Sequence, residues 1–358
     1  MSPEPGWARC LDAAFGPPLP GEYRAAPEDF LVDEELDFAP EGRGEHLWLR
    51  IEKREQTTLD VVRTLSRLCG VTPREVGYSG MKDRFAVTRQ WLSVHLPGRD
   101  APEVLETRLS ALGIAVLEQE RHPRKLKRGV HRANRFALRV GGEAVDAESF
   151  SARWQALCEG GVPNYFGPQR FGAQGRNLQR ARALLAQGWR KRDDRQGMLL
   201  SSARSFLFNE LLSARLTAGC WAMPLAGDTL MLDGTQSLFA VECVDAAIKR
   251  RAAELDLHPT GPLWGQGEGE SRGEVESAAP ARRFELRLEQ THPALCEGIE
   301  RAGAKSARRA LRLRLGTPEL TPLDSGARLE FSLPRGSFAT AVLRELLAHG
   351  DFAPWPAA

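Results

Sequence analysis

A short turn with one carboxylate is the strongest chemical feature of the sequence. Residues 77–84 read GYSGMKDR, so Asp83 lies between two cations, Lys82 and Arg84. Glycines allow tight backbone paths that bring the main chain close to a ligand. Adjacent cations favour the ionised carboxylate, which makes Asp83 available as a nucleophile or a base. A surface turn with a local ion pair has the same pattern, so these residues alone leave both interpretations open.

Other common catalytic and targeting patterns are missing. Met81 stands where a nucleophile elbow needs glycine, and residues 303–306 lack the Gly-Lys pair of a phosphate-binding loop. The cysteines and histidines show no metal-ligand spacing. Residues 1–20 lack a signal layout, and no apolar run reaches the ~18–20 residues of a membrane span. We therefore expect a cytoplasmic protein that uses neither metal nor cofactor and does not enter a membrane.

The elements around the turn are predicted from periodicity. Alternating apolar residues at 47, 49 and 51 indicate a strand, and residues 86–96 indicate another. Between them, Leu59, Val62, Leu65 and Cys69 would share one face of a helix over 58–69, capped by a threonine and ended by Gly70. A helix to residue 112 and strands at 114–117 and 136–140 follow. This order predicts an α+β sheet with helices on one face.

The second half of the chain is predicted to be mostly helical. Helices are predicted over 146–159, 175–188 and 201–219, and the Gly- and Pro-rich segment 258–281 resembles a flexible loop. A strand at 328–333 and a helix capped at Ser337 and running to His349 follow. A length of 358 residues suggests two domains. A helical middle between strand-bearing ends indicates an inserted domain.

Charge is balanced overall but segregated along the chain. Lys and Arg number 49 and Asp and Glu 47. Residues 28–45 hold eight acids against one arginine, whereas residues 121–139 hold eight bases and no acid. Residues 170–195 and 301–314 are also basic. Together these basic stretches could line an anionic ligand of nucleic-acid size, although each alone is also typical of a solvated helix face.

The turn also resembles a known signature. Residues 77–91, GYSGMKDRFAVTRQW, resemble the pattern G-x-K-D-(K/R)-x-A-x-T-x-Q of the TruD family of tRNA pseudouridine synthases. Further segments match that family in type and order: APEDFLV at 26–32, GRGEHL at 42–47, NRF at 134–136, GVPNYFGPQRFG at 161–172, 201–209 and LPRGSFAT at 333–340. The resemblance covers about residues 22–350.

This resemblance implies an α+β fold, a pseudouridine-synthase-like catalytic domain with a central mixed sheet that is interrupted by an inserted α/β domain. Residues 1–159 would form the N-terminal part of the catalytic domain, 160–303 the inserted domain and 304–358 the C-terminal part. The implied reaction is the isomerisation of uridine to pseudouridine in tRNA, at position 13. It needs no cofactor, and the enzyme is expected to act as a monomer.

The resemblance also implies roles for single residues. Asp83 would be the catalytic aspartate, which either attacks C1′ or removes a sugar proton from a flipped-out nucleotide. Phe136 would stack on the target uracil beside Asn134. The other substrate-binding candidates are Phe30, Phe338, Arg24 (where the family commonly carries lysine), Lys82 and Arg84. The basic stretch 121–139 would lie beside this pocket, and the acidic stretch 28–45, apart from Phe30, would face away from RNA.

Two alternatives remain from the sequence. A non-catalytic RNA-binding protein, such as a tRNA chaperone on the same fold, would share the basic stretches, but binding alone does not require Asp83. A glycosidase would need a second acid near Asp83, and no motif supplies one.

Overall fold

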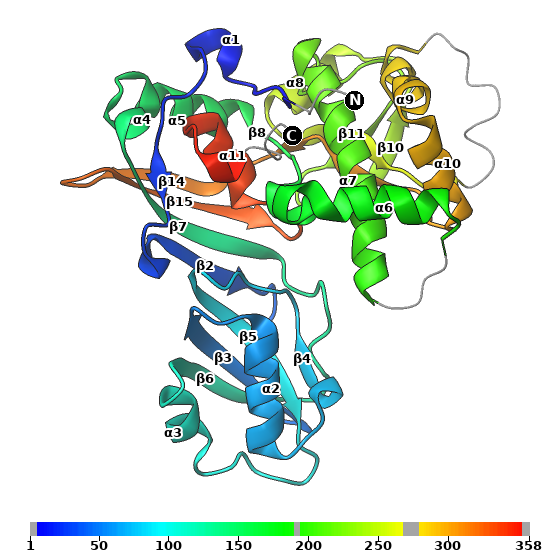
Figure 1. Cartoon of the computed structure of the whole chain (residues 1–358). Helices are drawn as coiled ribbons and strands as arrows, with labels where there is room; N and C mark the ends of the chain where they lie inside the picture. Colours follow the sequence, from blue (N-terminus) through cyan, green and yellow to red (C-terminus); the bar gives the residue numbers. More distant parts are fainter. Residues whose placement is uncertain (1–5, 190–193, 268–278, 353–358) are drawn as a thin grey trace. The chain divides into compact units, whose positions relative to one another are not determined.

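The computed structural model describes residues 6–189, 194–267 and 279–352, which form two compact units (Figure 1). Unit 2 contains residues 21–146 and 316–336, and unit 1 contains the described parts of 1–20, 147–315 and 337–358. These units are defined by contacts within the chain. The functional boundaries at 159/160 and 303/304 stay a prediction. No helix in the described part of the chain is long and apolar enough to cross a membrane.

Unit 2 is built on one large mixed sheet. Its strand order is β14-β15-β7-β2-β5-β3-β6, with β1 added to β7 and β4 added to β5. The β2–β5 pair is parallel and the other pairs are antiparallel, as the predicted mixed sheet requires. The strands are β1 (Glu22–Tyr23), β2 (Phe30–Glu35), β3 (His46–Arg54), β4 (Val76–Tyr78), β5 (Val87–His95), β6 (Ile114–His122), β7 (Ala133–Gly141), β14 (Gly316–Pro322) and β15 (Ala327–Pro334).

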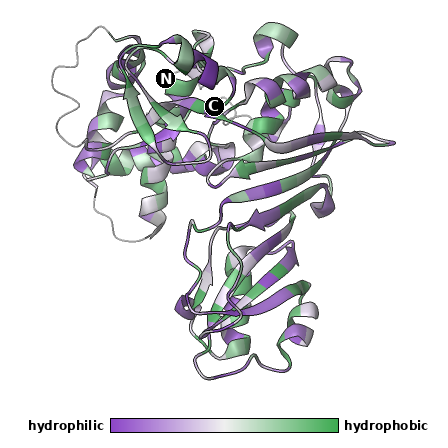
Figure 2. Cartoon of the chain, turned by 180° about the vertical axis from the view of Figure 1, so that it is seen from behind, coloured by the Kyte–Doolittle hydropathy of each residue, from purple (hydrophilic) through white to green (hydrophobic). Residues whose placement is uncertain are grey.

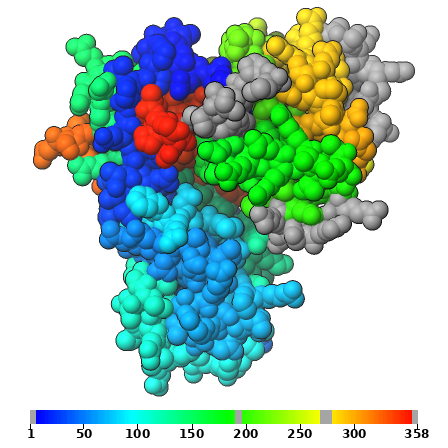
Figure 3. Space-filling model, in the orientation of Figure 1, coloured from blue at the N-terminus to red at the C-terminus, as the bar shows by residue number. Residues whose placement is uncertain are grey.

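Helix α2 (Thr58–Cys69) covers one face of this sheet. Successive side chains of a strand point to opposite faces, and Figure 2 shows the resulting hydrophilic and hydrophobic bands. Buried residues of α2 pack in one cluster with Leu47, Leu49 and Ile51 of β3. Figure 3 shows the atoms of this part of the chain, in blue, at the surface of the molecule. Burial of each such aliphatic side chain contributes roughly 1.5–3 kcal/mol.

The ends of α2 agree with the sequence prediction, but one residue of its buried face does not. Thr57 caps the helix in a capping box with Asp60, and Gly70 ends it at a φ of 62°. Leu59 was predicted to face the sheet and is instead 37% exposed, whereas Val61 is fully buried. Residue 58 points at the sheet, so residue 59, about 100° further round the helix, turns toward solvent.

Unit 1 combines helices with a smaller antiparallel sheet of order β10-β9-β11-β12. Its longest helix, α7, contacts α6, α9, α10 and β11, and its inner face contributes Phe206, Leu207 and Leu211 to the core. The elements are α1 (Asp12–Phe15), α5 (Ser149–Gly160), β8 (Val162–Pro163), α6 (Arg176–Ala186), α7 (Asp194–Thr217), β9 (Asp228–Leu232), β10 (Leu238–Val241), α8 (Ala246–Ala253), β11 (Leu257–Leu263), α9 (Pro280–Thr291), α10 (Pro293–Arg301), β12 (Ala307–Ala310), β13 (Arg312–Leu313) and α11 (Ala339–Leu346).

The loop predicted over 258–281 is wrong at its start. Residues 257–263 form β11, despite the turn-like sequence LHPTGPL. The strand pairs with β9 over residues 257–259 and with β12 over residues 260–263. Pro259 pairs with Leu230 of β9 and Pro262 with Arg308 of β12, so neither proline prevents the strand from pairing. Residues 268–278 of the predicted loop lie outside the described residues.

Two predicted helix boundaries also differ. The helix expected from residue 102 to 112 is α3 (Leu105–Ser110), because residues 111–113 form turns before β6. The helix expected from a Ser337 cap is α11, which begins after Phe338 and has no side-chain cap. Helix ends depend on tertiary contacts that periodicity does not report.

Candidate active site

The turn that carries Asp83 connects β4 to β5. Its ends are buried, but Met81, Asp83, Arg84 and Phe85 are exposed. Within the described residues, no hydrogen bond or ion pair holds the Asp83 carboxylate. Neither neighbouring cation pairs with it, because Lys82 points to Glu34 and the Arg84 Nε donates to the carbonyl of Glu55 at 3.2 Å. The carboxylate therefore remains available for a ligand.

A buried lysine fixes the main chain of Asp83. Lys53, at the end of β3, is 0% exposed. Its Nζ donates to the carbonyl oxygens of Asp83 at 3.0 Å and Gln56 at 2.5 Å. Burial lowers the pKa of Lys53 to about 8, while the nearby Asp83 charge favours the cation. Lys53 thus places a positive charge beneath the turn while the Asp83 carboxylate faces outward.

Hydrogen bonds from α2 and β5 hold the residues before Asp83. The Lys82 N–H donates to Thr58 Oγ1 at 2.9 Å, and that hydroxyl donates to Gln90 Oε1 at 2.9 Å. Gln90 Nε2 in turn donates to the carbonyl of Gly80 at 3.3 Å. The N-terminus of α2 and the middle of β5 therefore set the path of the turn together.

Lys82 and Glu34 form a buried ion pair. Lys82 Nζ lies 2.6 Å from Glu34 Oε2, with side chains 5% and 0% exposed. The other Glu34 oxygen accepts from the Trp91 N–H at 3.2 Å. Burial raises the pKa of Glu34, and Lys82 opposes that shift by its charge and hydrogen bond. A Cβ on Gly80 would lie 3.2 Å from Lys82 Nζ and 3.1 Å from His131 Cε1, so a larger residue here would require both groups to shift.

His131 and Ser79 join the turn to the segment that precedes β7. The His131 N–H donates to Ser79 Oγ at 2.7 Å, and Ser79 Oγ lies 2.6 Å from His131 Nδ1. The Gly129 N–H donates to the Ser79 carbonyl at 2.8 Å. Burial, with Lys82 and Arg335 nearby, lowers the pKa of His131 to about 4. The ring is therefore neutral near pH 7, and Nδ1 can accept the hydroxyl proton.

The face of the sheet beneath the turn holds the predicted base-binding residues. Strand register aligns Lys53, Thr88, Val32, Phe136 and Phe331 in one row across five strands. Phe136 lies two strands from Thr88, about 10 Å away at ~4.8 Å per strand. The adjacent row contains Glu34, Asn134 and Leu333. The sheet therefore brings Asn134 and Phe136 to the face on which Lys53 supports Asp83.

Phe136 is held by two other aromatic rings. It stacks on Phe331 with centroids 5.5 Å apart and meets Phe30 edge-on at 6.2 Å. Phe30 is 2% exposed and lies under the Arg24 guanidinium, which is 5.4 Å from its ring centre. Phe30 therefore contacts Phe136 directly, whereas Arg24 contacts Phe30. Phe136 itself is 6% exposed, and Phe331 covers one face of its ring.

Two buried polar atoms on this face have no hydrogen-bond partner among the described residues. They are Thr88 Oγ1 and Asn134 Oδ1. Such atoms cost free energy unless a ligand or water satisfies them. Their positions in the rows of Lys53 and Glu34 make them candidates for contacts with a polar ligand. Thr88 was not singled out from the sequence.

Phe338 belongs to unit 1, where it has a different set of neighbours. Its ring meets Phe166 at 5.9 Å, and the Arg170 guanidinium lies 5.7 Å from its centre. Arg170 Nε and Thr340 Oγ1 are also buried without a hydrogen-bond partner in the described part of the chain. Phe338 thus lies in a second polar and aromatic group, separate in sequence from the Asp83 turn.

Two of the charged stretches contain residues with structural roles. Whether the acidic stretch 28–45 faces away from RNA stays a prediction, but Glu34 within it is buried on the face that holds Phe136. The basic stretch 301–314, which together with the other two could line an anionic ligand, is in part structural. Arg308 pairs with Glu285 at 2.8 Å, and Arg312 is 3% exposed and donates to backbone carbonyls.

Several residues of the site were missed from the sequence, namely Glu34, Lys53, Thr58, Ser79, Thr88, Gln90 and His131. A signal existed for Lys53, since it continues the inward-facing series Leu47, Leu49 and Ile51. Among the described residues, no group of three His, Cys, Asp or Glu side chains could hold a metal ion.

Comparison with known proteins identifies the fold and then the family. A crystal structure from Methanosarcina mazei, described as a tRNA pseudouridine synthase D, superposes with a TM-score of 0.68 at 21% identity, over 93% of this chain and 95% of that one. This likeness shows the α+β fold of a pseudouridine synthase with a central mixed sheet.

The sequence comparisons are more specific. The model of the family described as tRNA pseudouridine synthase D (TruD) matches residues 13–192 and 192–346. A tRNA pseudouridine synthase D of Chromohalobacter salexigens is 57% identical over 98% of this chain and 99% of its own length. That of Methylococcus capsulatus is 44% identical over 94% of this chain and 93% of its own length. The chain belongs to the tRNA pseudouridine synthase D family.

The buried pair predicts a large effect on stability. Lys82→Met leaves Glu34 buried without its cation, and we expect the free energy of unfolding to fall by about 3–5 kcal/mol. Adding Glu34→Gln should recover part of that loss. Urea unfolding measures both, with the exposed neighbour Arg84→Met, expected within about 0.5 kcal/mol of wild type, as the control. Equal stability of the Lys82 and Arg84 variants would contradict the assignment.

The buried His131, which binds Ser79 through its N–H and its ring, predicts that the protein loses stability in acid. The pKa of His131 is about 4 in the folded protein and about 6.5 when unfolded, so only the unfolded chain binds this proton between those values. The stabilisation is complete above about pH 6.5 and is lost as pH falls toward 4. We expect His131→Gln to show a shallower decline in unfolding free energy than wild type, with His95→Gln as control. Parallel curves of unfolding free energy against pH for wild type and His131→Gln would rule out this role of His131.

Proposed function

We propose that the protein converts uridine to pseudouridine in tRNA, at position 13, with Asp83 as its catalytic residue. The observation that carries the proposal is the exposed Asp83 carboxylate, unpaired within the described residues, on a turn that matches the family signature. The main-chain contact from Lys53 fixes the position of Asp83 without occupying its carboxylate.

The reaction is balanced within one nucleotide. The N1–C1′ bond breaks, the uracil turns, and C5 joins C1′. The C5 proton is then lost and N1 gains one, so no outside group enters. Asp83 either attacks C1′ or removes a sugar proton, and both routes need an ionised carboxylate beside the ribose. The Lys53 ammonium beneath the turn holds the main chain of Asp83 in place for either route.

The target base must leave the RNA stack to reach Asp83. We place the uracil against Phe136, because this residue lies on the same face as Lys53. Asn134 Oδ1 could accept from uracil N3–H, and the Thr88 hydroxyl could donate to a uracil carbonyl. These contacts would satisfy both buried atoms. Phe30 and Arg24 would support Phe136 from beneath.

RNA backbone contacts would come from the basic stretch 121–139, where Arg124, Lys127, Arg128, Arg132, Arg135 and Arg139 are exposed. Arg84 is exposed on the turn itself and would add to them. Lys82 is engaged by Glu34, and its predicted contact with RNA would require that pair to open. The Phe338 group of unit 1 would supply further substrate contacts. We expect the protein to act as a monomer in the cytoplasm.

Removal of the carboxylate tests the function. We expect Asp83→Ala to bind unmodified tRNA as wild type does but to lose at least ~10³-fold in rate. Pseudouridine mapping after incubation with a tRNA transcript measures the product. Asp100→Ala removes an exposed acid in a weak surface pair and serves as the control, with an unchanged rate expected. Unmodified tRNA after incubation with wild type, or full modification by Asp83→Ala, would overturn the proposal.

The pKa of Lys53 predicts the alkaline side of the pH profile. As pH rises through about 8, the cation near Asp83 is lost, and we expect the single-turnover rate to fall. Burial disfavours charged Lys53 only in the folded protein, so stability rises over the same range and unfolding does not explain the loss. The Lys53→Met variant should have a low single-turnover rate at every pH and should not show the decrease near pH 8. A wild-type rate that stays flat to about pH 9.5 would contradict the role.

A further inference from the structure

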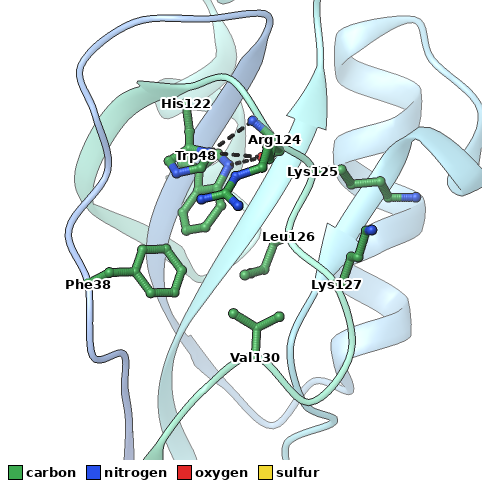
Figure 4. A pocket seen from close by; sticks show the side chains of 8 residues that line it. All are labelled: Phe38, Trp48, His122, Arg124, Lys125, Leu126, Lys127 and Val130. Atoms are coloured by element: carbon green, nitrogen blue, oxygen red, sulfur yellow. Dashed lines mark hydrogen bonds between the residues drawn. The ribbon is translucent and has the colours of Figure 1, made fainter.

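A cavity lies on the sheet face opposite Lys53. Trp48 and Lys53 are five residues apart on β3, so their side chains point to opposite faces. The cavity has a volume of about 330 Å³, within the range of ligand sites. Figure 4 shows its lining, with Phe38 facing Trp48 and His122 on one side and Leu126 and Val130 on the other. All of these residues belong to unit 2.

The aromatic wall of the cavity is fixed in place. Trp48 stacks on His122 with centroids 4.4 Å apart, and Phe38 meets Trp48 edge-on at 5.9 Å. Trp48 Nε1 donates to the Arg124 carbonyl at 3.0 Å, and the Arg124 N–H donates to His122 Nδ1 at 3.0 Å. Trp48 is 1% exposed, whereas Phe38 is 37% exposed. The wall thus consists of the buried, hydrogen-bonded Trp48 and the partly exposed ring of Phe38, which a planar ligand could reach.

The rim of the cavity is basic. Arg124 and Lys127 are exposed, and their side chains make no ion pair or hydrogen bond within the described residues. Lys125 differs, because its ammonium donates to the Arg74 carbonyl. One acid, Glu41, also reaches the rim, 3.9 Å from His122 Nε2. Figure 4 shows Arg124 near the aromatic rings and Lys127 on the other side of the same segment. Free cations on a segment that borders aromatic rings match the phosphates and the base of a nucleotide.

We propose that this cavity is a second nucleotide-binding site, which holds an unstacked nucleotide of the RNA substrate away from the target uridine. The inference rests on the proposed function, since that function supplies the RNA. The base would lie against Phe38 and Trp48, with the flanking phosphate on Arg124 and Lys127. Apolar walls at Leu126 and Val130 accept any base, so the pocket recognises an unpaired nucleotide rather than a sequence.

The cavity is also connected to the Asp83 turn by the chain itself. The segment that supplies Arg124, Leu126, Lys127 and Val130 continues to Gly129 and His131, which bind Ser79. Ser79 lies four residues before Asp83. A nucleotide in the cavity would therefore hold the segment that binds the catalytic turn at Ser79.

Photocrosslinking and binding test the proposal together. Ultraviolet crosslinking of an unmodified tRNA transcript to the full-length protein should join a nucleotide to peptides that contain Phe38, Trp48 or Lys127. Phe38→Ala should weaken binding of that transcript about tenfold, as the loss of one stacked base does. Lys127→Gln should weaken binding and reduce the salt slope by about one. Leu112→Ala and Arg67→Gln, exposed residues elsewhere in unit 2, serve as size and charge controls and should leave binding unchanged.

The outcomes separate this inference from the proposed function. Crosslinks confined to other peptides, or Phe38→Ala and Lys127→Gln variants that bind like their controls, would overturn the second site even if pseudouridine forms. A wild-type protein that makes no pseudouridine but crosslinks through Phe38 would overturn the proposed function and retain the site. If Phe38→Ala fails to fold, the wild-type crosslinks still decide, because Lys127 also belongs to the basic stretch that is proposed to contact the RNA backbone.

Discussion

The site depends on one buried cation, Lys53, that holds the main chain of Asp83 and leaves its carboxylate free. A carboxylate bound directly by a lysine would be well placed but already occupied. Here the Lys53 ammonium binds the carbonyl oxygen of Asp83 at 3.0 Å. The position of Asp83 is therefore fixed while its carboxylate stays available for a ligand. Burying that charge has a cost, seen in the lowered pKa of Lys53, and the nearby Asp83 charge offsets part of it.

The rest of unit 2 makes this arrangement possible. Glu34, one strand away from β5, neutralises the second buried cation, Lys82, which would otherwise lie beside Lys53 without a partner. Thr58 and Gln90 fix the backbone between them. The segment before β7 closes the other side through His131. The same sheet then presents Asn134 and Phe136 on this face and the Trp48 cavity on the opposite face.

The sequence predicted the elements better than the contacts among them. Strand alternation and the capped helix over 58–69 follow local rules, so β3 and α2 were predicted closely. The position of Asp83 on its turn was also predicted. The partners of that turn were not, because Glu34, Lys53 and His131 are brought together by strand pairing between distant segments. An acid-rich stretch gave no sign that Glu34 is buried against Lys82.

In unit 1, local composition predicted two features wrongly. The proline and glycine content of LHPTGPL indicates a loop, yet β11 lies inside a sheet because its two halves pair with different strands. Arg312 belongs to a basic run that resembles a nucleic-acid contact, yet it is buried and binds backbone carbonyls. Composition reports which charges are present, and only the fold decides whether they meet solvent.

We propose that the exposed carboxylate on the Lys53-supported turn contacts the ribose of a flipped uridine. The most direct measurement is a crystal structure of the Asp83→Asn protein bound to an unmodified tRNA. We expect a uridine outside the stack, with its C1′ beside residue 83 and its uracil in contact with Phe136, Asn134 and Thr88. A uridine that remains stacked in the RNA, or one bound away from residue 83, would contradict it.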